Sequence, residues 1–200
     1  MNDSQNPSAL RSKAMITESL LNLMHEIPYE EITVKRIILD TDLVRKTFYR
    51  NFKSKDDVLD SIIDKAIDEY TDALVSTTDD PLTVIFDFCK LNKELFSLLQ
   101  KNSMLYLLLL KLNEKIPQIS RTTDPDKNPF VKLMSDLEPD YLIALNIGAI
   151  WNIISLWLER GMKEDPSEIR HLIEEYLKRI AGTDHLIISF RKGIKHEQPT

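Results

Sequence analysis

The sequence predicts an all-α fold, and composition and apolar spacing are the two observations that predict it. The chain has 200 residues, of which 42% are hydrophobic and four are glycine. That hydrophobic content can bury a core, and the scarcity of glycine leaves few positions for loops with positive φ, which favours long helices. Apolar residues also recur at intervals of three and four along most of the chain, as they do on one face of a helix.

The first long helix is expected to begin near Ser8 and to end before Pro28. Its buried face is predicted from apolar residues at helical spacing, namely Ile16, Leu20, Leu23, Met24 and Ile27. Residues 29–32 then form a connector to the next helix.

Two short helices joined by a tight turn are expected over residues 33–55. Thr33 is placed to cap the first, whose buried side consists of Val34, Ile37 and Ile38. The turn falls at residues 41–43. In the second helix Phe48 and Phe52 share the buried face, because four residues separate them. The surface that remains carries Arg45, Lys46, Tyr49 and Arg50. This is the layout of a helix-turn-helix that places its second helix in a DNA major groove.

Basic charge is concentrated in the same segment. Residues 33–55 contain seven lysines and arginines against two aspartates, a net charge of +5, whereas the whole chain carries −6 and its remainder −11. Lys and Arg side chains that neutralise phosphates supply most of the sequence-independent affinity for DNA. A solvated charged face is the ordinary explanation of such a cluster, but the order of the helices favours a DNA-binding surface.

The rest of the chain is predicted to be helical, with breaks where proline and polar residues gather. A capping box of Ser54 and Asp57 starts a long helix that extends to about Val75. The pattern then predicts a break over 77–81, apolar-rich helical stretches over 82–99 and 104–112, a polar loop over 117–129, a short helix over 130–137, a long helix over 139–161, a capped helix over 165–182, and a tail with a short strand or helix near 186–190.

The cytoplasm is the expected compartment. The lone Cys89 cannot form an intrachain disulfide, and the polar N-terminus lacks the apolar stretch of a secretory signal. Residues 141–158 are an 18-residue run without a charge, at the lower limit for a membrane-spanning helix. Asn146, Asn152 and Ser155 interrupt the run, and a buried bundle helix is also apolar all round. No membrane partner is therefore expected.

No catalytic or metal-binding constellation is visible in the sequence. The four histidines match no metal-ligand spacing and are His25, His171, His185 and His196. Cys89 lies among apolar residues, as an inert core thiol does. Neither paired carboxylates nor a nucleophile beside a base can be assigned. We therefore expect neither an enzyme nor a bound cofactor.

The stretch Thr47-Phe48-Tyr49-Arg50-Asn51-Phe52-Lys53-Ser54-Lys55, preceded by Ile32-Thr33-Val34 and Ile37, resembles the signature of TetR-family transcriptional regulators. The resemblance covers about residues 10–65. It implies a homodimer of about nine helices per chain, with a DNA-binding domain over 1–55 and an effector-binding and dimerisation domain over 56–200. The implied function is that of a ligand-responsive regulator, most often a repressor, on a palindromic operator. The last two long helices would form the dimer interface.

Carried over residue by residue, the resemblance implies that Tyr49 and Lys55 contact phosphates and that Thr33 lies near the DNA backbone. It also places Arg45, Lys46 and Thr47 near base edges. Arg50 is a further candidate for DNA binding, because it lies on the exposed face of the same helix.

The chain departs from the family pattern at the turn. Where the family usually has Ala-Gly-Val-Ser, this chain has Thr41-Asp42-Leu43-Val44. The turn thus lacks its glycine, and the second helix lacks its serine cap. Asp42 tolerates a left-handed conformation and Thr41 can cap locally, so we expect the turn to be kept.

The C-terminal half is less diagnostic. Residues 147–158, followed by Gly161 and Pro166, are similar to a subgroup of such regulators, some of which resemble activators of dihydroxyacetone kinase genes. Core packing explains most aromatic residues here, and about a third of them are expected to line a pocket between helices. The candidate residues for binding a small apolar or amphipathic effector are Phe86, Cys89, Phe96, Met104, Tyr106, Met134, Asn146 and Trp151.

A rival interpretation is a small-molecule-binding or enzymatic helical bundle whose basic face is incidental. It predicts a pocket with reactive groups, whereas a DNA-binding regulator needs its cations on one exposed helix face.

Overall fold

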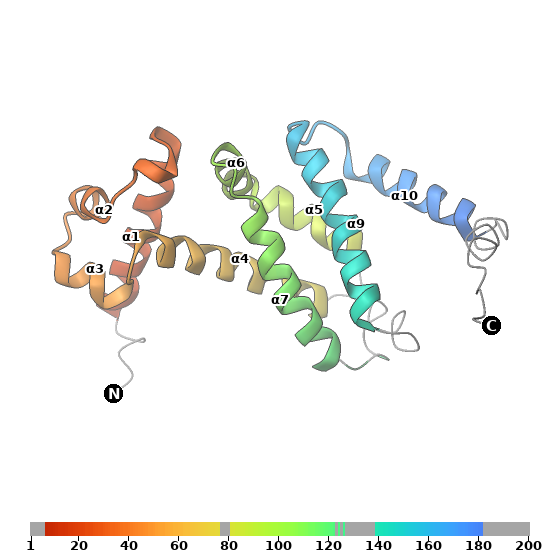
Figure 1. The fold of residues 1–200 in the computed structure, drawn as a ribbon, viewed down its shortest axis with the longest axis horizontal. Coiled ribbons are helices and arrows are strands. Elements are labelled where there is room, and N and C mark those ends of the chain that lie inside the picture. Colours follow the sequence, from red (N-terminus) through yellow and green to blue (C-terminus); the bar gives the residue numbers. More distant parts are fainter. Residues whose placement is uncertain (1–6, 77–80, 123, 125, 127–138, 182–200) are drawn as a thin grey trace, which may run out of the picture. The chain divides into compact units, whose positions relative to one another are not determined.

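The computed structural model describes residues 7–76, 81–122, 124, 126 and 139–181. Within these residues the chain forms nine α-helices, one short 3-10 helix and no strand (Figure 1), which confirms the all-α prediction. The elements are α1 (Pro7–Glu26), a 3-10 turn (Tyr29–Glu31), α2 (Val34–Thr41), α3 (Arg45–Asn51), α4 (Lys55–Ser76), α5 (Pro81–Leu91), α6 (Lys93–Lys101), α7 (Tyr106–Thr122), α9 (Pro139–Glu159) and α10 (Pro166–Ala181). The helix predicted over 130–137, Met134 and the predicted tail after Gly182 lie outside the described residues.

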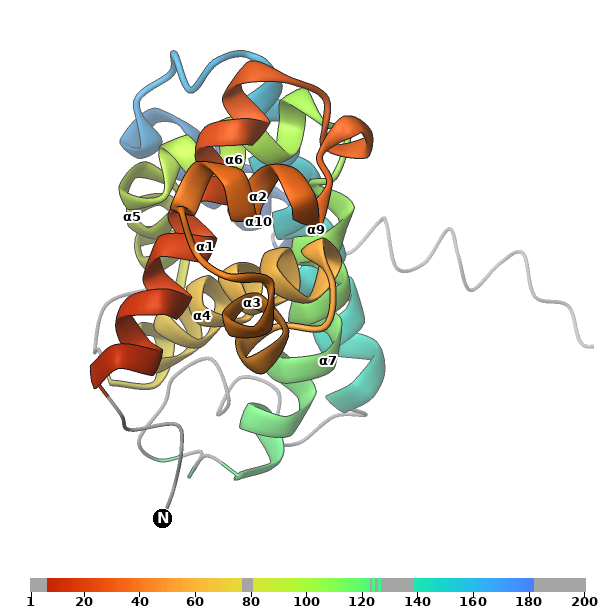
Figure 2. The ribbon, with the colours of Figure 1, turned by 90° about the vertical axis from the view of Figure 1, so that its left-hand side faces the viewer.

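The first three helices share one small core. α1 contacts α2, α3 and α4, and Figure 2 shows α2 and α3 beside α1. Ile16, Leu20 and Met24 of α1 are fully buried, as are Ile37 of α2 and Phe48 of α3. These are the positions at which the apolar spacing predicts burial, because each helix turns one stripe inward.

α4 begins at a polar cap and connects the three N-terminal helices to the other helices (Figure 1). The Ser54 hydroxyl accepts a hydrogen bond from the Asp57 backbone N–H at 3.1 Å, and the Asp57 carboxylate accepts one from the Lys53 N–H at 2.7 Å. The predicted capping box is therefore present, with its second bond shifted by one residue. The carboxylates of Asp56 and Asp57 in the first turn also stabilise α4, because negative charge interacts favourably with the positive end of the helix dipole.

α4 packs against α5 and α7, and α6 and α7 each contact α9. The Phe86 ring of α5 meets the Trp157 ring of α9 edge to face, with centroids 5.1 Å apart, and both side chains are buried. Leu98 and Leu99 of α6 are also buried. These helices form a second apolar core in which aromatic residues from α5 and α9 interlock.

The structure differs from the predicted pattern at two places. The apolar-rich stretch over 82–99 is divided at Asn92, whose side-chain amide donates to the Phe88 carbonyl at 3.0 Å. Asparagine competes in this way with regular helical geometry. The loop predicted from Pro117 is wrong over its first residues, because α7 continues through Pro117 to Thr122. The buried Ile116 side chain anchors this turn in the core, which offsets the hydrogen bond that proline cannot donate.

The chain forms two compact units, residues 1–160 and 161–200. The first unit ends where Gly161, at a φ of +76°, stops α9, as the sequence predicts. In the second unit the Asp165 carboxylate accepts hydrogen bonds from the Ser167 N–H at 2.8 Å and the Ser167 hydroxyl at 2.6 Å. This confirms the capped start of α10, with Pro166 as its first residue.

Candidate DNA interface and effector cavity

The turn between α2 and α3 forms without the usual glycine. Asp42 adopts the left-handed conformation, with φ of 52° and ψ of 24°, which an aspartate tolerates better than most residues. The Thr41 hydroxyl donates to the Ile37 carbonyl at 2.8 Å and lies 3.3 Å from that of Ile38. The left-handed Asp42 therefore replaces the glycine as expected, whereas Thr41 bonds back within α2 and does not cap α3.

The starts of the two helices differ. The Thr33 side chain accepts a hydrogen bond from the Arg36 N–H at 3.2 Å, so the predicted cap of α2 is confirmed. α3 begins after Val44, which makes no side-chain cap and is 68% exposed. The first amide N–H groups of α3 thus lack the hydroxyl or carboxylate acceptor that usually stabilises a helix start.

Replacing Val44 with serine should stabilise the protein. Val44→Ser supplies a capping acceptor and removes an exposed apolar side chain, so we expect the free energy of unfolding to rise by about 1 kcal/mol. For a chain of this size that corresponds to a Tm increase of roughly 2–4 °C. Val44→Ala is the control, because it removes the same apolar side chain without adding an acceptor. Equal Tm values for the two variants in thermal denaturation would contradict the capping argument.

The exposed face of α3 is cationic and aromatic. Arg45, Lys46 and Arg50 are exposed, and Tyr49 is 46% exposed. Phe48 and Phe52 fix the helix from its other side, at 0% and 3% exposure. The four exposed residues occupy positions i, i+1, i+4 and i+5 of one helix, so they form one row of donors that faces solvent.

Tyr49 supports the neighbouring arginine. The guanidinium carbon of Arg45 lies 5.4 Å from the centroid of the Tyr49 ring, a distance typical of a cation–π contact. The Tyr49 ring in turn meets the Phe48 ring edge to face at 5.4 Å. Thr47 is half-buried and lies toward the core side of this row. Contacts therefore connect Arg45 through the Tyr49 ring to the buried Phe48 ring.

Lys13 of α1 brings a cation to this region that sequence inspection missed. Its ammonium lies 5.5 Å from the centroid of the Phe52 ring, which follows α3. A separation of 39 residues gives no local signal for this contact, and it arises only because α1 packs across α3.

The Lys55 side chain makes its contacts within the protein. Its ammonium donates to the carbonyl oxygens of Tyr29 and Glu30 at 2.6 and 3.2 Å and lies 4.3 Å from the centroid of the Tyr29 ring. The Tyr29 hydroxyl donates to the Asp56 carboxylate at 2.5 Å. Burial and the nearby Asp56 raise the pKa of Tyr29, so the hydroxyl keeps its proton. A phosphate contact by Lys55 would compete with these two backbone bonds.

The end of α6 contacts the same connector from the other side. The Asn102 side-chain oxygen accepts from the Tyr29 N–H at 2.8 Å, and the Lys101 ammonium donates to the His25 carbonyl at 2.6 Å. The His25 ring also lies 3.0 Å from the Glu94 carboxylate. A shift of α6 would therefore act directly on the segment that joins α1 to α2.

The largely apolar cavity lies among α4, α5, α6, α7 and α9. It leaves about 50 Å³ open to the centres of water-sized spheres, well above the roughly 10–15 Å³ that one water molecule needs. Its lining residues are Ile67, Tyr70, Leu74, Ile85, Phe88, Cys89, Phe96, Leu108, Leu112, Ile116, Asn146, Ile147, Ile150, Trp151 and Ile154. Burial raises the pKa of Cys89 to about 12, so its thiol stays neutral.

The structure brings together half of the candidate ligand-binding residues. Cys89, Phe96, Asn146 and Trp151 line the cavity. Phe86 is buried against Trp157 instead, and Met104 and Tyr106 line a separate hollow beside Tyr29. Most of the lining residues that the sequence analysis missed are isoleucines and leucines. They have no signal of their own, because an aliphatic residue on a buried helix face looks the same whether it meets a neighbour or a cavity.

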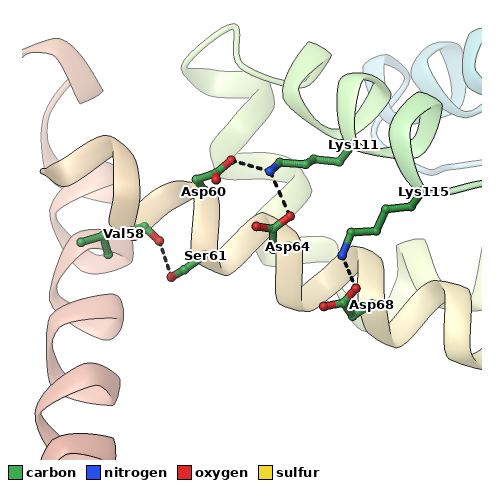
Figure 3. A network of polar contacts seen from close by, with 7 residues as sticks. All are labelled: Val58, Asp60, Ser61, Asp64, Asp68, Lys111 and Lys115. Carbon is green, nitrogen blue, oxygen red and sulfur yellow. Dashed lines mark hydrogen bonds and ion pairs between the residues drawn. The ribbon is translucent and has the colours of Figure 1, made fainter. Parts of the chain in front are cut away.

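A row of ion pairs joins α4 to α7 (Figure 3). The Lys111 ammonium lies 2.9 Å from the Asp60 carboxylate and 3.0 Å from that of Asp64, and Lys115 pairs with Asp68. The hydrogen bond to Asp60 is the main cause that raises the pKa of Lys111. The aspartates of these pairs are 37–58% exposed, so each contact adds at most about 1 kcal/mol.

Two further observations concern other kinds of site. Within the described residues, no group of three or more His, Cys, Asp or Glu side chains could hold a metal ion. In the same part of the chain one helix, over Asp140–Glu159, is long and apolar enough to cross a membrane. Core helices of soluble proteins meet the same criterion.

Comparison with known proteins shows a shared fold. No family model and no curated protein matches the sequence. Among solved structures, the chain is similar to the dihydroxyacetone kinase operon activator DhaS, with a TM-score of 0.55 and 19% identity over 84% of this chain and 96% of that one. It is also similar to the fatty acid degradation regulator FadR from Bacillus halodurans, with a TM-score of 0.53 and 17% identity over 86% and 95% of the two chains. The chain therefore has the all-helical fold of these transcriptional regulators, with an N-terminal helix-turn-helix.

Proposed function

We propose that this protein is a cytoplasmic, sequence-specific DNA-binding transcriptional regulator of the TetR type, and not an enzyme. The observation that carries the proposal is the single exposed row of Arg45, Lys46, Tyr49 and Arg50 on α3, supported by a buried aromatic face. Arginine and lysine commonly contact guanine in the major groove, and tyrosine hydroxyls contact phosphates. The structural neighbours, which are an operon activator and a degradation regulator by name, agree with this function.

The contacts follow from the position of each side chain. Arg45 and Lys46 reach base edges with Thr47 beside them, and Tyr49 and Arg50 contact phosphates. Thr33, which starts α2, lies near the DNA backbone, and Lys13 adds a cation from α1. Lys55 contributes mainly by holding the connector between α1 and α2, because its ammonium already donates to two carbonyls.

The regulator acts as a homodimer through its last two long helices. α9 exposes Tyr141, Leu145 and Leu156 at 80, 67 and 48%, and α10 exposes Leu172, Tyr176 and Leu177 at 71, 63 and 56%. Large apolar side chains at such exposure call for a partner, and a two-fold copy supplies one through a four-helix interface. A two-fold dimer reads a roughly palindromic operator, with half-sites about 34 Å apart or a multiple of that distance.

The cavity is the effector site. A bound molecule must have different affinities for two arrangements of the helices in order to change operator affinity. α4 and α6 both line the cavity and both reach the connector between α1 and α2, α4 through Lys55 and α6 through Asn102. We expect the effector to release a repressor from its operator by this route.

Selection of DNA fragments tests the proposal. Fragments of the source genome are incubated with the protein at about 150 mM salt, where phosphate-only binding is weak, and bound sequences are determined for the native chain, Tyr49→Ala and Tyr49→Phe. We expect one palindromic site with the native chain and its loss with Tyr49→Ala. Tyr49→Phe separates two roles, because it keeps the ring beneath Arg45 and removes only the hydroxyl. Enrichment that is absent, or identical for all three proteins, would overturn the assignment of α3 as the DNA-reading helix.

A further inference from the structure

The chemistry of the cavity lining restricts what can enter it. Among the described residues, no Asp, Glu, Lys, Arg or His side chain lines the cavity. Its polar side-chain groups are the Tyr70 hydroxyl, the Cys89 thiol, the Asn146 amide and the Trp151 indole N–H. All four are uncharged, since burial raises the pKa of both Tyr70 and Cys89. A carboxylate or ammonium moved from water into such surroundings loses its hydration without gaining a counter-charge.

Asn146 is the polar group that the structure orients. Its side-chain N–H donates to the Leu142 carbonyl one turn earlier in α9, at 2.8 Å, which fixes the plane of the amide. A side-chain amide has two N–H donors and an oxygen acceptor. Within the part of the chain that the structure describes, this is its one hydrogen bond, so a second N–H and the oxygen are left for a ligand. Tyr70 is a weaker candidate for binding a ligand than Asn146. Its ring packs against Phe88, with centroids 5.1 Å apart, and the residue is only 6% exposed.

We infer that the effector of this protein is a small uncharged molecule with an apolar or aromatic body and one hydrogen-bonding group, held by Asn146 among the isoleucines of α9. The inference rests on the proposed function only in giving this molecule a regulatory role, since its binding to the cavity does not depend on DNA. It excludes carboxylates, phosphates and amines from the cavity. An engineered apolar cavity of about 150 Å³ in another protein stays dry and binds benzene. The cavity here measures about 50 Å³, so its lining side chains have to move apart when an aromatic body enters.

Three molecules of matched shape test the charge requirement. Benzyl alcohol, benzoate and benzylammonium share one ring and differ in charge, and toluene lacks the polar group. Binding is measured by the rise in Tm and by the fluorescence of Trp151, which lines the cavity. We expect benzyl alcohol to bind at least tenfold more tightly than benzoate or benzylammonium. Equal affinity for a charged member, or no binding of either benzyl alcohol or toluene, would overturn the inference.

Two variants locate the binding. Asn146→Leu should weaken benzyl alcohol about fivefold, which is the value of one hydrogen bond, and leave toluene unchanged. Ile150→Trp fills the cavity from a half-buried position and should abolish binding of both molecules. Circular dichroism establishes that each variant is folded. Benzyl alcohol affinity that both folded variants retain would show that it binds elsewhere, which contradicts the inference.

Release of the selected DNA site is measured with the same molecules. If uncharged molecules bind the cavity but no DNA site is selected, the proposed regulatory function is contradicted while the inference about the ligand stands. A palindromic DNA site without discrimination by charge would do the reverse, so the two failures are distinguishable.

Discussion

Arg45→Ala is expected to weaken binding to the selected DNA site by roughly 5- to 150-fold, equivalent to about 1–3 kcal/mol. The side chain is exposed and held over the Tyr49 ring, so its guanidinium is oriented before DNA arrives. The loss should be accompanied by relaxed specificity at one base position, because a base contact and not only a phosphate contact is removed. Titration of labelled duplexes at fixed salt measures both effects.

A matched charge change provides the control. Lys65→Ala also removes one positive charge, but from α4. The Lys65 side chain is 79% exposed, and among the contacts described it pairs only with Glu69, at 3.7 Å. We expect its affinity to stay within about twofold of the native value, since α4 surface charges act on DNA through screened long-range fields. Equal losses for Arg45→Ala and Lys65→Ala would mean that net charge, not the α3 face, governs binding.

Phe86→Ala is expected to lower the free energy of unfolding by about 3–5 kcal/mol. Phe86 is 2% exposed and its ring meets Trp157 edge to face, so truncation leaves a hole in the core between α5 and α9. Leu110→Ala is the control on α7, where the side chain is 58% exposed, and its unfolding free energy should change by at most about 0.5 kcal/mol. Urea denaturation followed by circular dichroism measures both. A loss below about 1 kcal/mol for Phe86→Ala would contradict its place in the core and favour the sequence-based assignment to a ligand site.

The N-terminal helices were predictable because their signals are local. Thr33 caps its own helix, Thr41 bonds one turn back, and the spacing of Phe48 and Phe52 alone defines a buried face. Each of these interactions joins residues at most four apart, and the residue types involved have few other uses there. The left-handed Asp42 could be anticipated for the same reason, since a turn between two helices needs such a residue.

The cavity could not be predicted in the same way, because it depends on how five helices meet. Phe86 and Phe88 are two residues apart and equally aromatic, yet Phe88 lines the cavity and Phe86 packs against Trp157. The deciding fact is which side of α5 faces α9, and spacing within α5 does not contain it. Pro117 illustrates the same limit, since the tertiary anchor at Ile116 outweighs a local helix-breaking signal.

The ion pairs between α4 and α7 have an unusual redundancy. Aspartates recur every four residues along α4, at Asp56, Asp60, Asp64, Asp68 and Asp72. If α7 moved along α4 by one helical turn, about 5.4 Å, Lys111 would meet Asp64 and Asp68, and Lys115 would meet Asp72. The number of ion pairs would be unchanged, so these pairs favour contact between α4 and α7 without favouring one position of α7 along α4 over the other. The position of α7 along α4 is therefore determined by the apolar side chains between the helices, and by any molecule that binds among them.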